Sequence, residues 1–545
     1  MSSQVKARTG GHLVIDSLEA LGADVVFGLP GIHALAIWEG LRGSRLRSLN
    51  FRTELNAGFA ADGYARVSGR AAPLLLSTGP GALNALTALM EAATSYVPVV
   101  AISSQIPRAM MGKRRGFLHE LNDQIASFAP IVKWVATVQH AGQIPELLRE
   151  AWRMALSPPT GPVFLEVPYD VLLGDAGEAR PSGLAVTAGT APEADDEEVT
   201  QAAELLKHSG RPVIWAGGGV LRSGAWDELR ELAERLDAPV ATTYMGKGAF
   251  PDDHPLSAGS SPDDRAFQEL LSEADVVLCV GTELGAETTA QYALKFKGRV
   301  IQIEVDPLKV GATYPVLGLV GDAKETLRAL LGVVPANAAN SRSAKGRESA
   351  SAVRSRIAEG LNRQGRELER GMLETIRRVM PRDSITSWDM TILGYWAAAQ
   401  FPALTPRRFL YPLGSGTLGY AWPGALGAKA ALPDVPALAV VGDGGFLYGT
   451  SELLTARQHR LNAKLLVVDD GGYGILREYQ RHSFGETHSV DLVQPDFLAL
   501  CGACGVPARV TSENRLEIDL RWAMDIDGPA VVIFRGLLKA AEPTN

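Results

Sequence analysis

The stretch from residue 440 to residue 474 constrains the fold of this chain more than any other. An apolar run, Ala437 to Val441, breaks into Gly-Asp-Gly-Gly, and a segment with helical spacing leads to a second apolar run, Leu465 to Val468. The pattern predicts a strand, a glycine turn, a helix and a second strand. Parallel strands joined by a right-handed crossover end at the same sheet edge, so Asp443 and Asp470, which follow the two runs, are expected to meet there.

Two carboxylates at one sheet edge suit a particular kind of ligand. Backbone N–H groups that follow Gly444 attract an anion, and paired oxygen ligands hold a hard cation such as Mg²⁺. Together they fit a metal-bridged diphosphate. Either glycine turn alone is ordinary, because these residues are common in turns. The occurrence of both, each at the end of an apolar run, favours a binding site.

The same residues resemble a known motif. Gly442-Asp443-Gly444, an acidic pair and Gly472-Tyr473-Gly474 are similar to the thiamine diphosphate (ThDP) motif of acetolactate synthases, benzoylformate decarboxylases and their relatives. The resemblance implies that Asp443, Asp470 and the carbonyl of Gly472 bind Mg²⁺. It implies further cofactor contacts at Gly444, Gly445, Tyr473, Gly474 and Ile475.

The acidic pair is a visible departure from this motif. Asp469-Asp470 stands where the family has Asn-Asn. Asp470 would still ligate Mg²⁺, because carboxylate oxygens are ligands that this cation accepts. The added negative charge would oppose the diphosphate, so the departure bears on how tightly the site holds its metal.

Composition indicates a globular protein of several domains. The 545 residues are too many for one hydrophobic core and suggest about three domains. With 46% hydrophobic residues and a net charge of −8, nothing favours a nucleic acid or an anionic membrane as partner. No apolar run reaches the ~18 residues of a membrane span, and Met1 to Gly10 lacks the apolar core of a signal peptide. We therefore expect a cytoplasmic enzyme.

The three cysteines imply no disulfide framework. Cys501 and Cys504 form a Cys-Gly-Ala-Cys pair, which redox and metal sites also use. No second pair accompanies it, and the residues before it have the spacing of a buried helix face. A structural role is therefore expected for both.

Alternating strand-like and helix-like segments predict an α/β fold with three doubly wound parallel-sheet domains. Linker-like composition near Gly174 to Glu198 and Pro335 to Arg370 places the domains at 1–175, 192–334 and 371–545. The resemblance implies that they are, in order, a pyrimidine-binding domain, a middle domain and a diphosphate-binding domain. Some acetolactate synthases bind FAD in the middle domain, but here we expect that domain to be empty.

Glu54 is the leading catalytic candidate in the first domain. A Glu at a helix start is commonly a solvated first-turn acid. However, Glu54 to Asn56 and Gly79 to Asn84 look like consecutive blocks of the family's pyrimidine-binding domain, where the matching Glu hydrogen-bonds N1′ of the cofactor. A carboxyl group shielded from water keeps its proton near neutral pH, which suits that role. By position, the resemblance also implies cofactor contacts at Pro30, Thr78 and Asn84.

Two further segments resemble parts of the cofactor site. Gly414 to Gly419 is similar to the segment that carries a bulky residue beneath the cofactor. The resemblance makes Leu418 that residue and directs the 4′-amino group to the carbonyl of Gly416, whereas without the motif Leu418 reads equally well as a core leucine. Thr391 is a diphosphate contact by position.

The substrate pocket is less constrained. Leu118-His119-Glu120 occupies the place of a Phe-Gln-Glu block in acetolactate synthases, and His119 can move a proton where glutamine cannot. A loop histidine beside a glutamate is equally often just hydrogen-bonded. His33, in a Pro-Gly-Ile-His sequence, is the second candidate. Both patterns also look like those of 5-guanidino-2-oxopentanoate decarboxylases.

The resemblance implies a ThDP- and Mg²⁺-dependent enzyme that cleaves or forms the C–C bond beside the carbonyl of a small 2-oxo acid. We expect acetolactate synthase-like ligation, with simple decarboxylation to an aldehyde, of the benzoylformate or guanidino type, as the alternative. Ser77 and Leu476 replace catalytic residues of two specific decarboxylase types, so neither is matched in full. A non-catalytic ThDP-binding protein is the alternative from another class.

In the family Glu54 and Asp443 come from different subunits, which implies a homodimer or homotetramer.

Overall fold

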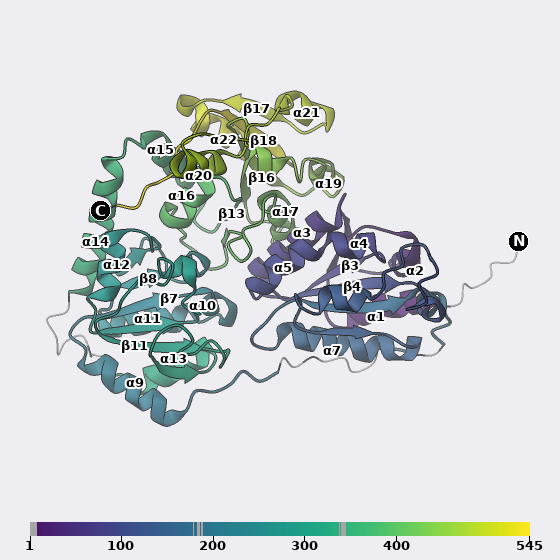
Figure 1. The fold of residues 1–545 in the computed structure, drawn as a ribbon, viewed down its shortest axis with the longest axis horizontal. Helices are drawn as coiled ribbons and strands as arrows, with labels where there is room; N and C mark the ends of the chain where they lie inside the picture. Colours follow the sequence, from purple (N-terminus) through teal and green to yellow (C-terminus); the bar gives the residue numbers. More distant parts are fainter. Residues whose placement is uncertain are drawn as a thin grey trace, which may run out of the picture.

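The structure, a computed structural model, describes residues 8–544 apart from 178, 182–185, 187–188, 337 and 339–344. Its strands form three six-stranded sheets in which every neighbouring pair is parallel (Figure 1). Helices cover both faces of the sheets. The prediction of three doubly wound α/β units is therefore confirmed.

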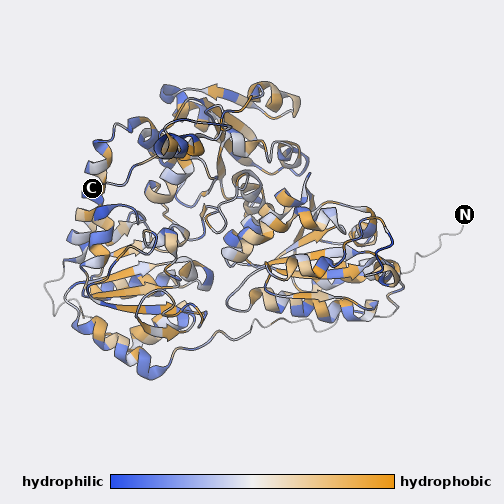
Figure 2. Ribbon diagram, viewed as in Figure 1, coloured by the Kyte–Doolittle hydropathy of each residue, from blue (hydrophilic) through white to orange (hydrophobic). Residues whose placement is uncertain are grey.

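The first sheet has the strand order β2-β1-β3-β4-β6-β5. Its central strands are apolar runs buried on both faces, as parallel sheets require (Figure 2). The strands are β1 (Val25–Gly28), β2 (Arg47–Asn50), β3 (Ala72–Leu76), β4 (Val99–Gln105), β5 (Val135–Thr137) and β6 (Val163–Pro168). The longer helices are α1 (Gly10–Ala20), α3 (Glu54–Ser68), α5 (Leu86–Thr94) and α7 (Ile144–Leu156), and η1 (Ile32–Ala34) and α2 (Leu35–Gly40) follow β1.

The middle sheet has a different order, β12-β11-β10-β7-β8-β9. Its strands are β7 (Pro212–Ala216), β8 (Val240–Thr242), β9 (Ser257–Gly259), β10 (Val276–Val280), β11 (Arg299–Glu304) and β12 (Leu317–Val320). The covering helices include α9 (Asp196–His208), α10 (Gly218–Ser223), α11 (Trp226–Leu236), α12 (Arg265–Ser272) and α13 (Ala323–Val333). Apolar runs in the sequence predict strands at 213–216, 240–243, 276–280 and 300–304, and these limits lie within one residue of β7, β8, β10 and β11.

The third sheet, β14-β13-β15-β16-β18-β17, repeats the topology of the first. Its strands are β13 (Ile385–Trp388), β14 (Phe409–Leu410), β15 (Ala437–Gly442), β16 (Ala463–Asp469), β17 (Ala508–Thr511) and β18 (Ala530–Arg535). Its helices include α16 (Ile392–Gln400), α17 (Ala421–Ala431), α18 (Asp443–Phe446), α19 (Glu452–Gln458), α20 (Gly474–Phe484), α21 (Phe497–Ala503) and α22 (Leu516–Asp525). The segment of linker-like composition, Pro335 to Arg370, contains α14 (Gly346–Asn362), and α15 (Glu367–Val379) begins near its end.

The structure also bears on the predictions for the cysteines and for membrane-spanning helices. All three cysteines are free, and Cys501 is buried on α21, as its structural interpretation expects, whereas Cys504 is half-buried. None of the helices that the structure describes is long and apolar enough to cross a membrane. The exact domain limits stay predictions.

The first and third domains are joined along α3 and α17, which lie side by side in Figure 1. Glycines remove the side chains at the crossing. A Cβ atom at Gly63 would lie 2.1 Å from the carbonyl oxygen of Gly424, and one at Gly427 would lie 1.8 Å from that of Ala60. The two helix backbones therefore touch directly, which only glycine permits at these positions.

This crossing predicts a large effect for one methyl group. We expect Gly427→Ala to lower the free energy of unfolding by about 1–3 kcal/mol, because two packed backbones must move apart to admit it. Urea unfolding measures the loss. Gly371→Ala, on α15 with no atom near its added Cβ, is the matched control and should be neutral or stabilising. Equal stability of the two variants would contradict the close contact.

Candidate functional site

Asp443 and Asp470 lie together at the carboxyl edge of the third sheet, as the sequence pattern predicts. β15 pairs with β16 in a register that sets Gly442 opposite Val468, so the residues that follow both strands are neighbours. Asp443 is 1% exposed, and neither of its carboxylate oxygens makes a hydrogen bond. Burial, and then the carboxylate of Asp470, raises the pKa of Asp443 to about 6. The pKa of Asp470 is also raised to about 6, mainly by burial.

Buried carboxylate oxygens without a partner are costly, and a cation is the simplest compensation. Oδ1 of Asp470 also lacks a hydrogen bond. The carbonyl oxygen of Gly472 lies close to Gly444, beside the same turn. Among the described residues, no group of three or more His, Cys, Asp or Glu side chains is placed to hold a metal ion, so a metal here would rest on two carboxylates and this carbonyl. The donor set is all oxygen and fits Mg²⁺.

The other residues predicted around this turn are close to it. The Tyr473 ring packs against Gly444, and Gly474 lies against the carboxylate of Asp470. Thr391, which precedes α16, places its hydroxyl beside Gly442. Gly445 lies against the carboxylate of Asp389, and Ile475 is 9% exposed and packs in the core.

Arg477 offsets the extra carboxylate of the acidic pair. Its guanidinium on α20 lies 3.9 Å from Oδ1 of Asp470 and donates a hydrogen bond of 2.9 Å to Asp491. The side chains of Arg477 and Asp470 are each 8% exposed, so solvent screens this interaction little. The expected repulsion between Asp470 and a diphosphate is therefore reduced by a cation of the chain itself. Sequence reasoning missed this role, because it depends on how α20 folds back over the sheet edge.

Glu54 and Asn84 form a second group on the first domain. Nδ2 of Asn84 donates to Oε2 of Glu54 at 2.8 Å, and Gly81 lies against Oε1. Glu54 begins α3 and is half-buried in the single chain. Asn56, two residues further, donates to the carbonyl of Tyr448, which attaches this helix start to the third domain.

Thr78 and Pro30, the other cofactor contacts predicted on this domain, differ in whether their side chains face the protein interior or the solvent. Thr78 is fully buried, and its hydroxyl hydrogen-bonds Ser104 at 2.9 Å, so its side chain faces the interior. Pro30 is exposed at the end of the first βα turn. Of these two residues, only Pro30 has a side chain open to a ligand.

The two candidate histidines are brought together beside the glycine loop 77–81. The ring centroids of His33 and His119 are 5.3 Å apart. Nδ1 is buried and without a hydrogen bond in both rings. Burial, and then the proximity of His119, lowers the pKa of His33. The carbonyl of His119 packs against Gly79, and His119 has a φ of 66°, a left-handed conformation that non-glycine residues seldom adopt.

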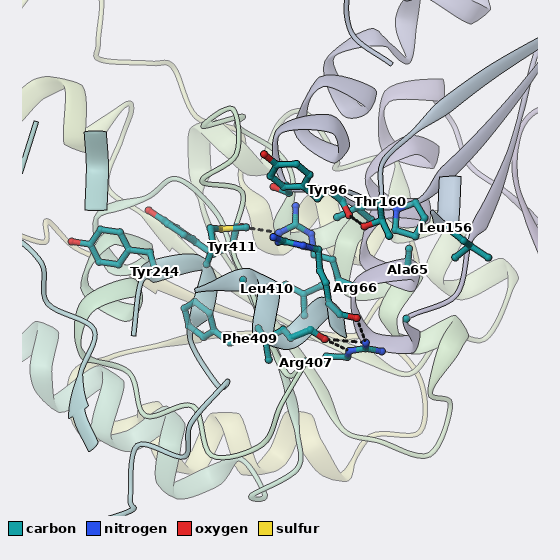
Figure 3. A pocket seen from close by; sticks show the side chains of 18 residues that line it. Ala65, Arg66, Tyr96, Leu156, Thr160, Tyr244, Arg407, Phe409, Leu410 and Tyr411 are labelled. Carbon is teal, nitrogen blue, oxygen red and sulfur yellow. Dashed lines mark hydrogen bonds between the residues drawn. The ribbon is translucent and has the colours of Figure 1, made fainter. Parts of the chain in front are cut away.

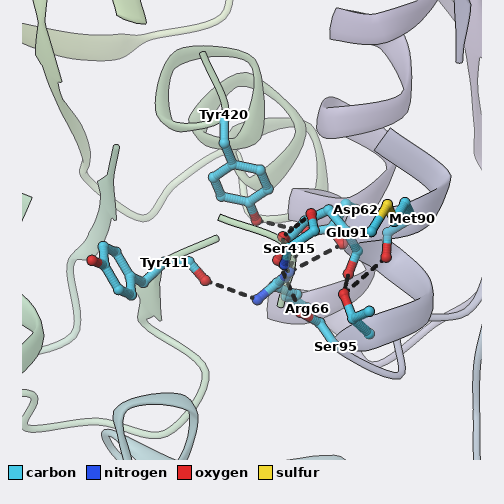
Figure 4. A network of polar contacts seen from close by, with 9 residues as sticks. Asp62, Arg66, Met90, Glu91, Ser95, Tyr411, Ser415 and Tyr420 are labelled. Carbon is cyan, nitrogen blue, oxygen red and sulfur yellow. Dashed lines mark hydrogen bonds and ion pairs between the residues drawn. The ribbon is translucent and has the colours of Figure 1, made fainter. Parts of the chain in front are cut away.

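The loop that carries Gly416 and Leu418 is attached at both ends to buried charges of the first domain (Figure 4). The backbone N–H and the hydroxyl of Ser415 donate to Oε2 of Glu91 at 2.7 and 2.8 Å. The hydroxyl of Tyr420 donates to Asp62 at 2.7 Å. Within this loop Gly416 is exposed and Leu418 is half-buried.

Arg66 holds these two carboxylates together. It is 13% exposed, donates to Glu91 at 2.8 Å and pairs with Asp62 one turn away on α3, and both carboxylates are fully buried. Ser95 adds a hydrogen bond to Glu91. Sequence reasoning missed this cluster, although an Asp and an Arg four residues apart within a helix of small buried residues are a usable signal.

A cavity of about 210 Å³ lies where the three domains meet (Figure 3). Tyr96, Tyr244 and Tyr411 line it, together with Arg66 and Arg407. None of the residues predicted from the sequence to bind cofactor or substrate lines this cavity. The cavity is therefore distinct from the group around Asp443 and Asp470 and from the group of Glu54 and Asn84.

Known proteins resemble this chain over its length. Models of the thiamine pyrophosphate enzyme family match residues 8–127 (N-terminal TPP binding domain), 199–330 (central domain) and 389–534 (C-terminal TPP binding domain). The probable 2-ketoarginine decarboxylase AruI of Pseudomonas aeruginosa is 38% identical over 534 residues, which cover 97% of this chain and 94% of that protein. The probable acetolactate synthase large subunit of Methanocaldococcus jannaschii is 32% identical over 533 residues, covering 94% and 90%. The acetolactate synthase large subunit of Corynebacterium glutamicum is 30% identical over 549 residues, covering 98% and 87%.

The buried cluster predicts a large cost for removing one charge. We expect Glu91→Gln to destabilise the protein by about 3–5 kcal/mol, because Arg66 loses a buried partner and Ser415 loses its strongest acceptor. Urea unfolding measures it. Glu150→Gln, which breaks the surface pair with Arg153, is the control and should change little. A Glu91→Gln variant as stable as this control would exclude the anchoring role.

Asp389 predicts a pH dependence of stability. Its carboxylate accepts from the N–H groups of Met390 and Gly419, yet burial raises its pKa to about 7. Between the unfolded value of about 4 and this value the folded state binds more protons, so stability should fall as pH rises through this window. The slope attributable to Asp389 approaches about 1.4 kcal/mol per pH unit. Urea unfolding of the cofactor-free protein from pH 4 to 8 should give a shallower decline for Asp389→Asn, and parallel curves would refute the shift.

Proposed function

The chain belongs to the thiamine pyrophosphate enzyme family, and on that premise we propose that it is a ThDP- and Mg²⁺-dependent decarboxylase that releases an aldehyde from a 2-oxo acid. The observation that carries this proposal is the close approach of His33 and His119 beside the glycine loop, with Nδ1 of both rings buried and without a hydrogen bond. It reverses the order of the two activities expected from the sequence, where ligation came first. A pair of imidazoles favours transfer of a proton to the carbon that has lost CO₂. It gives no comparable advantage to attack of that carbon on a second carbonyl compound.

The group around Asp443 and the group around Glu54 are proposed to bind opposite ends of the cofactor. Asp443, Asp470 and the carbonyl of Gly472 would hold Mg²⁺ against the diphosphate, and Glu54 would bind the aminopyrimidine ring. Leu418 and the carbonyl of Gly416 are the proposed contacts between these two ends. Bound ThDP supplies an electron sink for the pair of electrons that remains when CO₂ leaves a 2-oxo acid.

The histidine pair then decides the product. The carbon that has lost CO₂ must take up either a proton or a second carbonyl compound. With its lowered pKa, His33 is mainly neutral near pH 7. Since Nδ1 of neither ring is engaged in a hydrogen bond, the pair is free to exchange a proton with the substrate.

Glu120 supports a cationic substrate. Its Oε2 accepts from the N–H groups of Gly116 and Phe117, which fixes the carboxylate, while Oε1 is buried and without a hydrogen bond. A guanidinium group is the planar donor that best satisfies such an oxygen. The relative named as a probable 2-ketoarginine decarboxylase agrees with this choice. We therefore propose a 2-oxo acid with a guanidino side chain as substrate.

A homodimer or homotetramer is part of the proposal. Within one chain, the described hydrogen bonds of Glu54 include none to Asp443, Asp470 or Leu418. Large apolar side chains stay exposed near both groups: Ile32, Leu35, Met90, Leu447 and Tyr448 are each 40–50% exposed. A second subunit that covers them would bring Glu54 of one chain to Asp443 of the other.

Ligation of the acetolactate synthase type is the second candidate. It is favoured by the acetolactate synthases of M. jannaschii and C. glutamicum, with which the chain shares 30–32% identity. Ser77, at a position where benzoylformate decarboxylases carry a histidine, also agrees with it. A non-catalytic protein is disfavoured because Glu54, Leu418, Asp443 and Asp470 are all present.

Product analysis separates these activities. With ThDP and Mg²⁺, we expect CO₂ and the matching aldehyde from 5-guanidino-2-oxopentanoate, detected by mass spectrometry, and little product from pyruvate or benzoylformate. Glu54→Gln and His119→Gln should each lower kcat by about 10²-fold or more, as expected for lost proton transfer. His482→Gln, an exposed histidine, is the control and should leave kcat unchanged.

Removal of the metal by EDTA should abolish turnover in this assay, and added Mg²⁺ should restore it. Acetolactate from pyruvate as the main product would overturn the decarboxylase proposal. Activity that survives Glu54→Gln would overturn the assignment of that residue.

A further inference from the structure

A cavity of about 560 Å³ lies between the middle and third domains, apart from the residues assigned to chemistry. Its walls come from β9 of the middle sheet, from α14 and α15, and from the end of α16. In Figure 1, α14 and α15 lie on the side of the molecule where these two domains meet. A volume of this size is typical of small-molecule sites.

The cavity concentrates positive charge in a chain whose net charge is −8. Five basic and two acidic side chains line it. Arg354 on α14, and Arg370 and Arg377 on α15, are all half-buried, and none of the described carboxylates lies within ion-pair distance of them. They donate hydrogen bonds to uncharged groups only, which are backbone carbonyls for Arg354 and Arg377 and a side-chain amide for Arg370.

The acids at the cavity do not neutralise these guanidinium groups. Asp252 lies 3.4 Å from the ammonium of Lys247, which is 2% exposed and needs that carboxylate for itself. The other lining acid, Glu374, is exposed to solvent. Arg378 pairs with Glu517 outside the cavity wall. Three positive charges therefore remain for a ligand.

The rest of the wall is apolar. Ile357 and Leu361 on α14 and Leu373 on α15 line the cavity and are each 4% exposed. Gln400 adds an amide at the end of α16. A ligand that uses the whole cavity therefore needs an apolar or planar part and an anionic part. Guanidinium forks match phosphate oxygens in geometry as well as in charge.

We propose that this cavity binds a phosphorylated metabolite of nucleotide size, with its phosphates on Arg354, Arg370 and Arg377. A nucleoside diphosphate carries about three negative charges at neutral pH, which equals the unpaired positive charge. Such a ligand joins the middle domain to the third. It contacts the far end of α16, whose first residue follows Thr391 at the proposed diphosphate site.

Isothermal titration of the protein saturated with ThDP and Mg²⁺ tests the site, with ADP, pyrophosphate and adenosine as probes. We expect ADP to bind the natural protein and Arg354→Ala/Arg370→Ala to weaken binding more than tenfold. Arg356→Ala is the matched control, because Arg356 is on the same helix, pairs with Glu269 and does not line the cavity. It should bind ADP like the natural protein.

A second variant keeps the test independent of the arginines. Ala358→Trp fills the cavity from an exposed position of α14 and should also abolish ADP binding without changing the charge. ADP or pyrophosphate binding that is lost in both variants and kept in Arg356→Ala supports the proposal. Binding of neither probe to the natural protein, equal binding to all variants, or binding of adenosine as tight as that of ADP would overturn it.

Discussion

Parallel pairing of β15 with β16 is the constraint on which the candidate site depends. It delivers two carboxylates to one edge and leaves the oxygens of Asp443 buried without a hydrogen bond. No packing of apolar groups relieves such a deficit, because only a cation or a proton neutralises a buried carboxylate. The glycines of the turn and the Tyr473 ring close the space around these oxygens, so that a small ion fits better than a side chain. The fold thus leaves buried negative charge at this edge that a bound cation would compensate.

The cluster of Asp62, Arg66 and Glu91 has a complementary role. A buried arginine between two carboxylates adds little stability by itself, since desolvation offsets most of the attraction. Its contribution here is to position a loop, because Glu91 and Asp62 each accept a hydrogen bond across the domain boundary from the loop that carries Gly416 and Leu418. The position of this loop therefore depends on the first domain as well as on its hydrogen bond to Asp389 in the third domain.

Local patterns predicted most of the framework. Apolar runs bounded by glycine, such as the one that ends at Val441, are continuous because both faces of a parallel strand are buried, and they locate the strands within a residue or two. The meeting of Asp443 with Asp470 followed from the handedness of the crossover alone. Glu54, by contrast, was a candidate only through resemblance, because no local pattern distinguishes it from a solvated acid in the first turn of a helix.

Contacts between distant segments were not predictable in this way. The pairing of Arg477 with Asp470 depends on the path of α20, and the approach of His33 to His119 brings the short helix η1 against a distant loop. The positive charge of the cavity between the middle and third domains is likewise not predictable from the sequence, because the arginines on α14 and α15 have the pattern of ordinary solvated residues. Such features arise from tertiary packing, which a periodicity of 2 or 3.6 does not encode.

The repeated strand order of the first and third sheets gives the contact of α3 with α17 a further meaning. Each of these helices connects the second strand of its own sheet to the third, so they are equivalent elements of two similar domains. Gly63 meets Gly424, and Gly427 meets Ala60, much as matching residues meet across a homodimer. The chain thus contains a pseudo-twofold axis. A single ancestral domain that paired with itself would build the same contact, with the glycine loops after β3 and β15 as two versions of one ancestral loop.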